Sequence, residues 1–300
     1  MIPGKYIWMD GVLTPWEEAK VHVMLTHSLH YGSAVFEGVR FYETENGSVL
    51  FRNGDHVDRI FYSSSFMEMQ LKFSKKDIVK AQVLTAKESG LKNGYIRPIF
   101  YITGKVGVPP IGGEAHVAIG CWGWDKYLAA DSVRVKTSKW RRIPQNADIC
   151  DAKICGHYFN AALASMDAQK NGYHEALMLD QNDFIAEGPG ENLFIIKDGK
   201  IYTPKNEGNF LPGITRHSVI IIAKDLGYEV VEKNFKLDEV YNADEAFFTG
   251  TAAEVQPIES VDDKLIKNRI GQITSKLREV YLDTVHGKVE KYQKWLTYFN

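Results

Sequence analysis

Short apolar runs closed by glycine turns constrain the fold of this 300-residue chain more than any other feature. The opening "KYIWMDGVLTPWEEAKVHV" alternates in polarity around Asp10-Gly11, and Asp198-Gly199 divides "NLFIIKDGKIYTP" into two apolar arms. Asp-Gly between such arms is a strong signal for a β-hairpin. The sequence therefore predicts antiparallel pairing both at its start and in its second half.

Segments with helical spacing alternate with the strand-like runs, so we expect an α+β protein. The predicted helices are 55–69, 75–90, 159–170, 215–226 and 270–282. Further strands are predicted at 95–103, 115–124, 133–140, 228–235 and 245–250, with a further hairpin at 175–188 and a strand-like stretch before Lys153. Periodicity lapses between Lys126 and Val133, which predicts a smaller domain at 1–125, an interdomain loop at 126–133 and a larger domain at 134–300.

Composition excludes several classes of protein. A net charge of −2 gives no basic field for nucleic acid. The three cysteines lack zinc-site spacing, which fits free thiols in a reducing compartment. The start resembles no secretory signal, and no apolar run approaches the roughly 18 residues that span a membrane. We expect a cytoplasmic protein without nucleic-acid or membrane partners.

One lysine stands in an unusual place. In "DAKICGHYFNAALA", Lys153 lies among small and apolar residues just before a predicted helix. Removing an unpaired ammonium from water costs several kcal/mol, so lysine is seldom fully buried. Lys153 therefore either touches the interior only at its stem or is held there for chemistry.

Three glycine-rich segments could approach a ligand closely. "EGPGEN" contains Glu187 and Gly190, "LPGITR" places Gly213 ahead of a helix, and "FFTGTAAE" ends a strand at Gly250. Free backbone amides at helix starts and tight turns bind anions, although most such segments are ordinary turns.

Two arginines add possible anion contacts. Arg59 lies in a predicted helix, where a surface guanidinium is the alternative. In "YIRP", Tyr95 and Arg97 share one face of a strand, so Arg97 needs an anionic partner or water.

The histidine-rich segment "HSLHYGSAVFEGVRFY" does not match a zinc helix, and we expect no metal site. The motif GxSxG is absent, while a Cys155–His157 pair stays possible as a nucleophile and base. Covalent acyl transfer has little other support in the sequence.

Taken in order, these motifs resemble the fold-type IV, class IV pyridoxal-phosphate aminotransferases, and among them the branched-chain amino acid aminotransferases. "HYGSAVFEGVR", "YIRP", "AKICGHYFNAALA", "EGPGENLF", "LPGITR" and "GTAAE" cover nearly the whole chain in the family's order. The resemblance implies a fold of two α/β domains joined by a short loop. It also implies transamination of leucine, isoleucine and valine with 2-oxoglutarate.

The resemblance assigns a role to each motif that contacts pyridoxal phosphate. Lys153 would bind the cofactor covalently and move a proton, Glu187 would pair with the pyridine nitrogen, and Tyr158 would bond the ring oxygen. The implied positions around the phosphate are Arg59, Gly213, Ile214, Thr215, Gly250 and Thr251.

Substrate positions follow from the same resemblance. Tyr95, with the amides of Thr251 and Ala252, would hold the α-carboxylate, and Arg97 would bind the distal carboxylate of glutamate. The remaining implied substrate-binding positions are Tyr31, Phe36, Gly38, Val108, Trp124, Tyr127 and Gly190. Tyr31 and Val108 would come from a neighbouring subunit, which implies a homodimer or a larger homo-oligomer.

The sequence departs from the family's commonest pattern at Ile154, Cys155, His157 and Pro189. None of these departures removes a chemical group that the mechanism needs, so the resemblance indicates the reaction type more firmly than the substrate preference. D-Amino acid transaminase, (R)-amine transaminase and aminodeoxychorismate lyase share the cofactor and stay open as alternatives. So does a binding protein for a phosphorylated ligand, although binding phosphate alone does not require Lys153.

Overall fold

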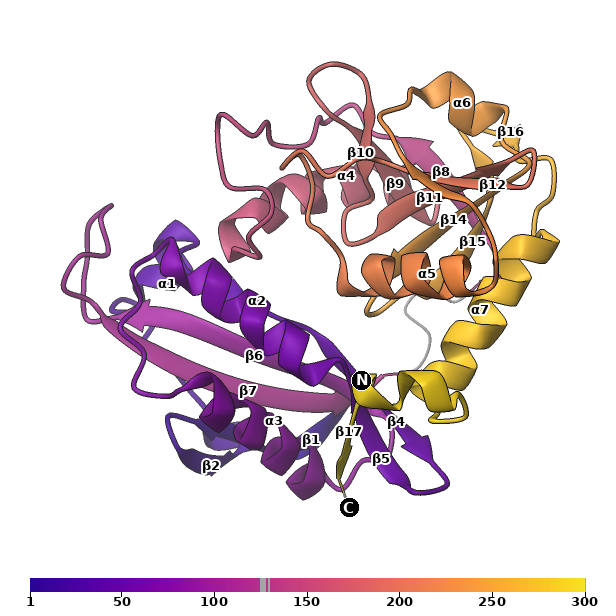
Figure 1. The fold of residues 1–300 in the computed structure, drawn as a ribbon. Helices are drawn as coiled ribbons and strands as arrows, with labels where there is room; N and C mark the ends of the chain where they lie inside the picture. Colours follow the sequence, from indigo (N-terminus) through magenta and orange to yellow (C-terminus); the bar gives the residue numbers. More distant parts are fainter. Residues whose placement is uncertain (125–127, 129, 300) are drawn as a thin grey trace. The chain divides into compact units, whose positions relative to one another are not determined.

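The computed structural model describes residues 1–124, 128 and 130–299, which divide into two compact units (Figure 1). Unit 1 contains Met1–Asp125, Ala152–Gly156 and Thr284–Asn300, and unit 2 contains Lys126–Asp151 and His157–Asp283. The domain division at 125 and 134 stays a prediction. The units differ from it because the Lys153 segment and the C-terminal segment belong to unit 1.

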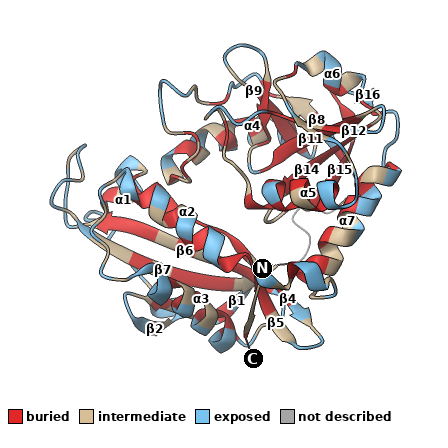
Figure 2. Cartoon of the chain, in the orientation of Figure 1, coloured by how far each residue is buried: buried red, intermediate tan, exposed pale blue. Residues whose placement is uncertain are grey.

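An antiparallel sheet forms the centre of unit 1. In the described residues it has eight strands, in the order β17-β5-β4-β6-β7-β1-β2 with β3 beside β6. The strands are β1 (Ile2–Met9), β2 (Val12–Pro15), β3 (Val35–Phe36), β4 (Val39–Thr44), β5 (Gly47–Phe51), β6 (Gly94–Thr103), β7 (Glu114–Gly123) and β17 (Leu296–Phe299). Buried residues run along β6 and β7, the long central pair (Figure 2).

The helices of unit 1 pack against this sheet. They are α1 (His27–Tyr31), α2 (Asn53–Ser65) and α3 (Lys75–Ser89), with 3₁₀ turns η1 (Trp16–Glu18) and η3 (Glu290–Trp295). Helix α3 packs on β1 and β7. It begins with a capping box, in which Ser74 and Asp77 bond each other's backbone amide, and it ends at Gly90 with φ 75°.

Unit 2 is built on a mixed sheet. Its nine strands within the described residues follow the order β10-β9-β8-β15-β14-β11-β12-β13, with β16 beside β15. The strands are β8 (Val133–Thr137), β9 (Glu175–Leu179), β10 (Ile185–Glu187), β11 (Asn192–Lys197), β12 (Lys200–Thr203), β13 (Val230–Glu232), β14 (Glu245–Gly250), β15 (Glu254–Val261) and β16 (Lys264–Leu265). Leu177, Leu193, Phe248 and Ile258 are among the fully buried side chains of its core.

The remaining helices are α4 (Tyr158–Lys170), α5 (Ile214–Asp225), α6 (Leu237–Tyr241), α7 (Gln272–Val285) and the 3₁₀ turn η2 (Cys155–His157). Helix α4 packs on β9, and α5 packs on β14. No helix in the described part of the chain is both long enough and apolar enough to cross a membrane.

The structure confirms the α+β class and the three predicted hairpins, of which the one at 175–188 is formed by β9 and β10. Asp10-Gly11 joins β1 to β2, and Asp198-Gly199 joins β11 to β12, with positive φ at all four residues. The predicted strand before Lys153 is wrong, because residues 138–153 contain no strand. The sequence analysis also missed β4, β5, β15 and the C-terminal β17, which pairs with β5.

Candidate active site

The backbone of Lys153 is fixed against β3. Its carbonyl accepts the Phe36 amide at 3.1 Å, and its amide donates to Ser63 Oγ at 2.9 Å. Next to it, Cys155 N–H donates to Ala34 O at 2.8 Å. These bonds satisfy the backbone of a segment that is not part of a regular strand. They place the lysine Nζ 4.9 Å from the centroid of the Phe36 ring.

A buried charge cluster lies in the same unit. The fully buried Glu37 accepts hydrogen bonds from Arg59 Nε at 2.5 Å and Nη2 at 2.9 Å, and from His56 Nδ1 at 2.7 Å. Burial by itself would raise the pKa of Glu37, but Arg59 and His56 outweigh it and hold that pKa well below its usual range. Burial lowers the pKa of His56. The cluster therefore combines a carboxylate, a guanidinium and a neutral imidazole.

The Lys153 amine is easier to deprotonate than an ordinary lysine. Loss of solvent around the side chain lowers its pKa to about 8, although the charge of Glu37 opposes the shift. Arg59 and Arg97 lower it further. A substantial fraction of the amine is therefore neutral near physiological pH, the form that can attack a carbonyl or accept a proton.

Arg97 lies among aromatic rings. Its guanidinium carbon is 4.5 Å from the centroid of the Phe36 ring and 5.4 Å from that of Tyr95. It makes one long contact, at 3.5 Å, to the Tyr95 hydroxyl, and its buried Nε has no partner. Within the described residues it forms no ion pair, so this arginine can receive an anionic ligand.

Gly38 makes room for the Tyr95 hydroxyl. A Cβ built at position 38 would lie 1.6 Å from Tyr95 Oη, which no side-chain adjustment of a few tenths of an ångström could relieve. Trp124 packs edge-on against the Tyr95 ring at a centroid distance of 4.9 Å. Successive contacts thus link Lys153, Phe36, Arg97, Tyr95 and Trp124, and their roles in substrate binding stay a prediction.

Tyr31 and Val108 occupy a more exposed part of unit 1, with 44% and 76% of their surface accessible. The imidazole of His27 connects the two segments. Its ring packs 4.5 Å from that of Tyr31, and its Nε2 lies 2.8 Å from the carbonyl oxygen of Gly107. Tyr127, the remaining predicted pocket residue, lies outside the described residues.

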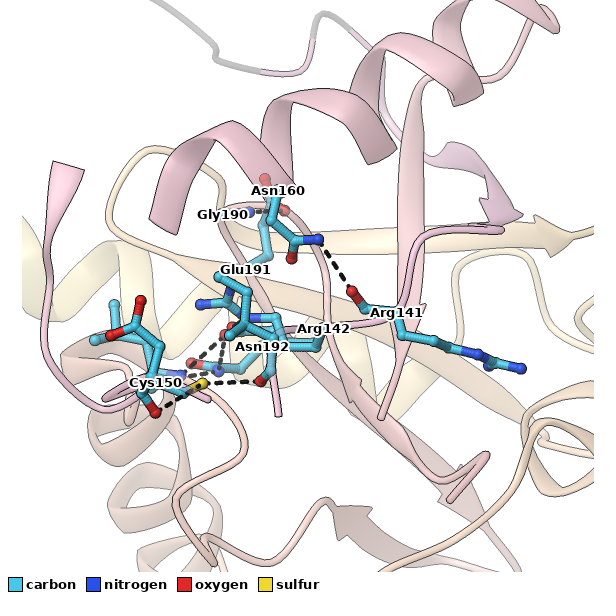
Figure 3. A network of polar contacts seen from close by, with 11 residues as sticks. Arg141, Arg142, Cys150, Asn160, Gly190, Glu191 and Asn192 are labelled. Atoms are coloured by element: carbon cyan, nitrogen blue, oxygen red, sulfur yellow. Dashed lines mark hydrogen bonds and ion pairs between the residues drawn. The ribbon is translucent and has the colours of Figure 1, made fainter. Parts of the chain in front are cut away.

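Glu187 is the centre of a second buried cluster, in unit 2. Its carboxylate accepts hydrogen bonds from Arg142 Nε at 2.5 Å and from the Leu211 amide at 3.2 Å, with Asn192 Nδ2 at 3.5 Å. Burial would lower the pKa of Arg142, but the Glu187 carboxylate raises it. Figure 3 shows Arg142 and Asn192 in the surrounding polar network, which extends to Cys150. The hydrogen bond from the arginine fixes the Glu187 carboxylate in position.

Glycines allow close approaches among the loops of unit 2. Gly213 caps the N-terminus of α5, just before Ile214 and Thr215, and a Cβ there would lie 2.1 Å from Asn192 Oδ1. Gly250 ends β14, and a Cβ on it would approach the Gly190 carbonyl to 3.1 Å. Thr251 and Ala252 form the turn between β14 and β15, while Tyr158 begins α4.

A cysteine nucleophile is not supported. Burial raises the pKa of the Cys155 thiol to about 11, despite the nearby charges of Arg97 and Lys153. The thiol is therefore protonated at neutral pH, and only the thiolate is an effective nucleophile. The described residues also include no group of three or more His, Cys, Asp or Glu arranged to hold a metal ion.

Comparison with protein-family models identifies the group to which this arrangement belongs. The model described as amino-transferase class IV matches residues 34–261, which include Lys153, Glu187 and all the glycine-rich loops. The chain belongs to the class IV amino-transferase family. The match begins at Ala34 and so leaves out Tyr31, which the sequence analysis placed in the substrate pocket.

Relatives of this class IV amino-transferase extend over its full length. It is 45% identical over 297 residues to the branched-chain-amino-acid aminotransferase of Pseudomonas aeruginosa, covering 97% of this chain and 96% of that one. It is 38% identical over 303 residues to the Escherichia coli enzyme of the same name, covering 98% and 97%. The solved T.th. branched-chain amino acid aminotransferase complexed with N-(5'-phosphopyridoxyl)-L-glutamate superposes with a TM-score of 0.96, at 44% identity and full coverage of both chains.

Four buried residues of this class IV amino-transferase were not assigned by sequence reasoning: Glu37, His56, Arg142 and Asn192. Glu37 stands in the apolar context of "SAVFEGVR", where a charged residue signals a buried partner. Arg142 in "WRRIP" has no comparable signal, because its partner Glu187 is 45 residues away along the chain.

The shifted pKa of Lys153 predicts an unusual pH dependence of acylation in the cofactor-free protein. Only the neutral amine reacts, so the rate at Lys153 should rise with pH and level off above a midpoint near 8. The acylation rate of exposed lysines should keep rising until the pH reaches their usual pKa of about 10.4. Quantitative mass spectrometry of acetylated peptides measures both in one sample, and a Lys153 midpoint near 10 would contradict the burial argument.

Proposed function

We propose that this protein transfers the amino group of leucine, isoleucine or valine to 2-oxoglutarate, giving branched-chain 2-oxo acids and L-glutamate. Pyridoxal phosphate bound at Lys153 is the proposed cofactor, and the two half-reactions follow one another in ping-pong order. The observation that carries the proposal is a lysine with a pKa near 8, linked through Phe36 to Arg97, which forms no ion pair within the described residues. The names of the full-length relatives support the same reaction.

The residues fit the cofactor chemically. When bound, pyridoxal phosphate supplies an aldehyde that links to an amine and a ring that delocalises the electron pair left on the substrate Cα. Lys153 is the proposed attachment point and then the base that takes a proton and returns it. A pKa near 8 suits both directions of proton transfer at neutral pH.

Unit 2 supplies the proposed contacts to the ring and part of those to the phosphate. Glu187 pairs with the pyridine nitrogen and favours a protonated ring, and Arg142 holds that carboxylate in place with a hydrogen bond from its Nε. Tyr158 bonds the ring oxygen. The proposed phosphate contacts are the guanidinium of Arg59 and the groups at Gly213, Ile214, Thr215, Gly250 and Thr251, where the start of helix α5 favours an anion.

One pocket must accept two kinds of side chain. Apolar walls from Phe36 and Trp124, with Tyr127, accept a branched aliphatic chain, whereas Arg97 binds the distal carboxylate of glutamate. Arg97 can serve both because aromatic rings surround it and no carboxylate of the described chain holds it. The proposed α-carboxylate contacts are Tyr95, Thr251 and Ala252, and Gly38 leaves the space that the Tyr95 hydroxyl needs. Gly190 is a further proposed substrate-binding position.

Borohydride reduction tests the cofactor assignment directly. The protein loaded with pyridoxal phosphate should yield a single phosphopyridoxyl-lysine peptide containing residue 153, and Lys153→Ala should yield none and lose transaminase activity. An exposed lysine substitution, Lys20→Ala, should change neither result. Activity with D-alanine or aminodeoxychorismate, and none with L-leucine, would favour the related transaminases or the lyase instead. A binding protein would give no labelled lysine.

Arg97→Met tests the dual pocket. Removing the guanidinium should raise KM for 2-oxoglutarate and glutamate by about 10–100-fold, the effect of a lost hydrogen bond to a charged group. KM for leucine should change by only a few fold because its side chain carries no charge. Arg141→Met, which removes a half-exposed arginine of unit 2, serves as the matched control. Equal losses for both substrates would contradict the assignment.

We further propose a homodimer or larger homo-oligomer acting in the cytoplasm. Tyr31 and Val108, proposed to complete a neighbouring subunit's pocket, are exposed, as are the apolar side chains of Leu29, Val106 and Ile111 in the same two segments. Exposed apolar groups that gather in this way are typical of interaction surfaces. The three free cysteines support a reducing compartment.

The oligomer proposal predicts that activity depends on concentration. Dilution should lower specific activity in parallel with the appearance of monomer in sedimentation velocity, because a monomer would lack the contributions of Tyr31 and Val108. With Val108→Lys, the loss of specific activity and the appearance of monomer should both occur at higher protein concentration. A monomer that keeps full activity would contradict the shared pocket.

A further inference from the structure

The buried carboxylate of Glu37 is fixed from several sides. The residue follows β3, and its amide donates to the Pro98 carbonyl of β6 at 2.9 Å. Its Oε1 accepts Arg59 Nε, while its Oε2 accepts Arg59 Nη2, His56 Nδ1 and the Gly38 amide, the last at 3.2 Å. Sheet, helix α2 and the turn at Gly38 therefore all hold one carboxylate that the reaction itself does not require.

We propose that Glu37 is a positioning residue that holds the Arg59 guanidinium in the orientation in which it binds the cofactor phosphate. The inference rests on the proposed function, because it presupposes that Arg59 contacts that phosphate. It assigns to Glu37 a role in cofactor affinity and in the charge balance around Lys153, and no contact with the substrate.

Geometry supports this assignment. Arg59 is on α2, and a long arginine side chain loses considerable rotamer freedom when it binds an anion. The paired bonds from Nε and Nη2 fix the plane of the guanidinium as well as its position. These two bonds use the Nε–Nη2 edge of the guanidinium, so its Nη1 nitrogen points away from Glu37. An arginine that is already oriented binds a phosphate at a lower entropic cost.

His56 strengthens the same arrangement. It lies three residues before Arg59 on α2, so the two side chains project from one face of the helix. Its Nδ1–H donates to Glu37 Oε2, the oxygen that also accepts the bond from Arg59 Nη2. With His56 neutral, Glu37 and Arg59 balance each other's charge, and the guanidinium can be held there without a net charge in the interior.

The charge of Glu37 also reaches Lys153. The titratable and charged groups around this amine are Glu37, His56, Arg59, Tyr95, Arg97 and Cys155. Glu37 opposes the loss of the lysine proton, whereas Arg59 and Arg97 favour it. Removal of the Glu37 charge therefore leaves two cations near the amine, and the pKa of Lys153 should fall below its present value of about 8.

A purely structural ion pair predicts a different set of effects. Loss of such a pair would alter folding and would weaken the binding of all ligands to a similar degree. A positioning role predicts selective loss of binding to ligands that carry the phosphate. Pyridoxal, which has the same ring and aldehyde but no phosphate, distinguishes the two roles.

The experiment compares the affinities of the cofactor-free protein for pyridoxal phosphate and for pyridoxal, followed by absorbance. Glu37→Gln should lower the affinity for pyridoxal phosphate by about tenfold or more, because a residue that supports a binding group is lost. The affinity for pyridoxal should fall by less than about twofold. Glu43→Gln is the matched control, because Glu43 forms an exposed ion pair with Lys92 in the same unit. Its two affinities should equal those of the wild type.

A double-mutant cycle tests whether Glu37 acts through Arg59. In an Arg59→Met background, Glu37→Gln should cause no further loss of pyridoxal phosphate affinity. Its effect on Lys153 should persist as an acylation midpoint displaced to lower pH. An equal loss in both backgrounds, or an unchanged ratio of the two affinities in Glu37→Gln, would overturn the proposal.

Two further measurements cover the case in which Glu37→Gln does not fold. Glu37→Asp keeps the charge but retracts the carboxylate by one methylene. It should still lower the affinity for pyridoxal phosphate relative to that for pyridoxal. In the wild type, the Arg59 Nε–H should be protected from hydrogen exchange before any phosphate is added, and rapid exchange there would overturn the proposal. If the wild type itself failed to attach pyridoxal phosphate at Lys153, the proposed function would be wrong instead.

Discussion

The pairing of buried charges is the constraint on which both clusters depend. A carboxylate removed from water is tolerated only when hydrogen-bonded opposite charges surround it, and removing one partner of such a pair costs about 3–5 kcal/mol. Glu37 meets this condition through Arg59 and His56, and Glu187 meets it through Arg142 and the amide of Leu211. Each unit therefore holds one buried carboxylate at a fixed position.

The two clusters differ in what they do to their neighbours. In unit 1 the charges balance and leave Lys153 as the group with the shifted pKa, because lost solvation outweighs the attraction of Glu37. In unit 2 Arg142 donates a hydrogen bond to the Glu187 carboxylate, and the attraction of that carboxylate raises the pKa of Arg142. Burial thus makes the Lys153 amine easier to deprotonate in unit 1, while unit 2 holds the Glu187 carboxylate in a buried ion pair.

Local patterns in the sequence predicted the elements that depend on local interactions. The Asp-Gly hairpins and the helix after Lys153 could both be predicted from residues within a few positions of each other. The strand β17 could not, because its pairing with β5 joins residues about 245 positions apart. The stretch before Lys153 was misread as a strand because its backbone is satisfied instead by turns and by contacts with β3.

The motif resemblance located Lys153, Glu187 and the glycine loops, but it did not reveal the residues that hold them. Glu37 and Arg142 act through partners that only the folded chain brings near, and Gly38 is required by a tyrosine hydroxyl 57 positions later. Residues that contact a ligand belong to recognisable segments, whereas their supports are defined by packing. This is why spacing alone could not identify them.

The path of the chain has a consequence for any division of this protein. Because Ala152–Gly156 and the C-terminal segment belong to unit 1, the backbone passes from one unit to the other four times. Gene fragments that end near residue 125 would encode a sheet without its β17 edge and without the reactive lysine. Recombination that exchanges contiguous segments therefore cannot transplant either unit whole, and the enzyme must be inherited, expressed and engineered as one uninterrupted polypeptide.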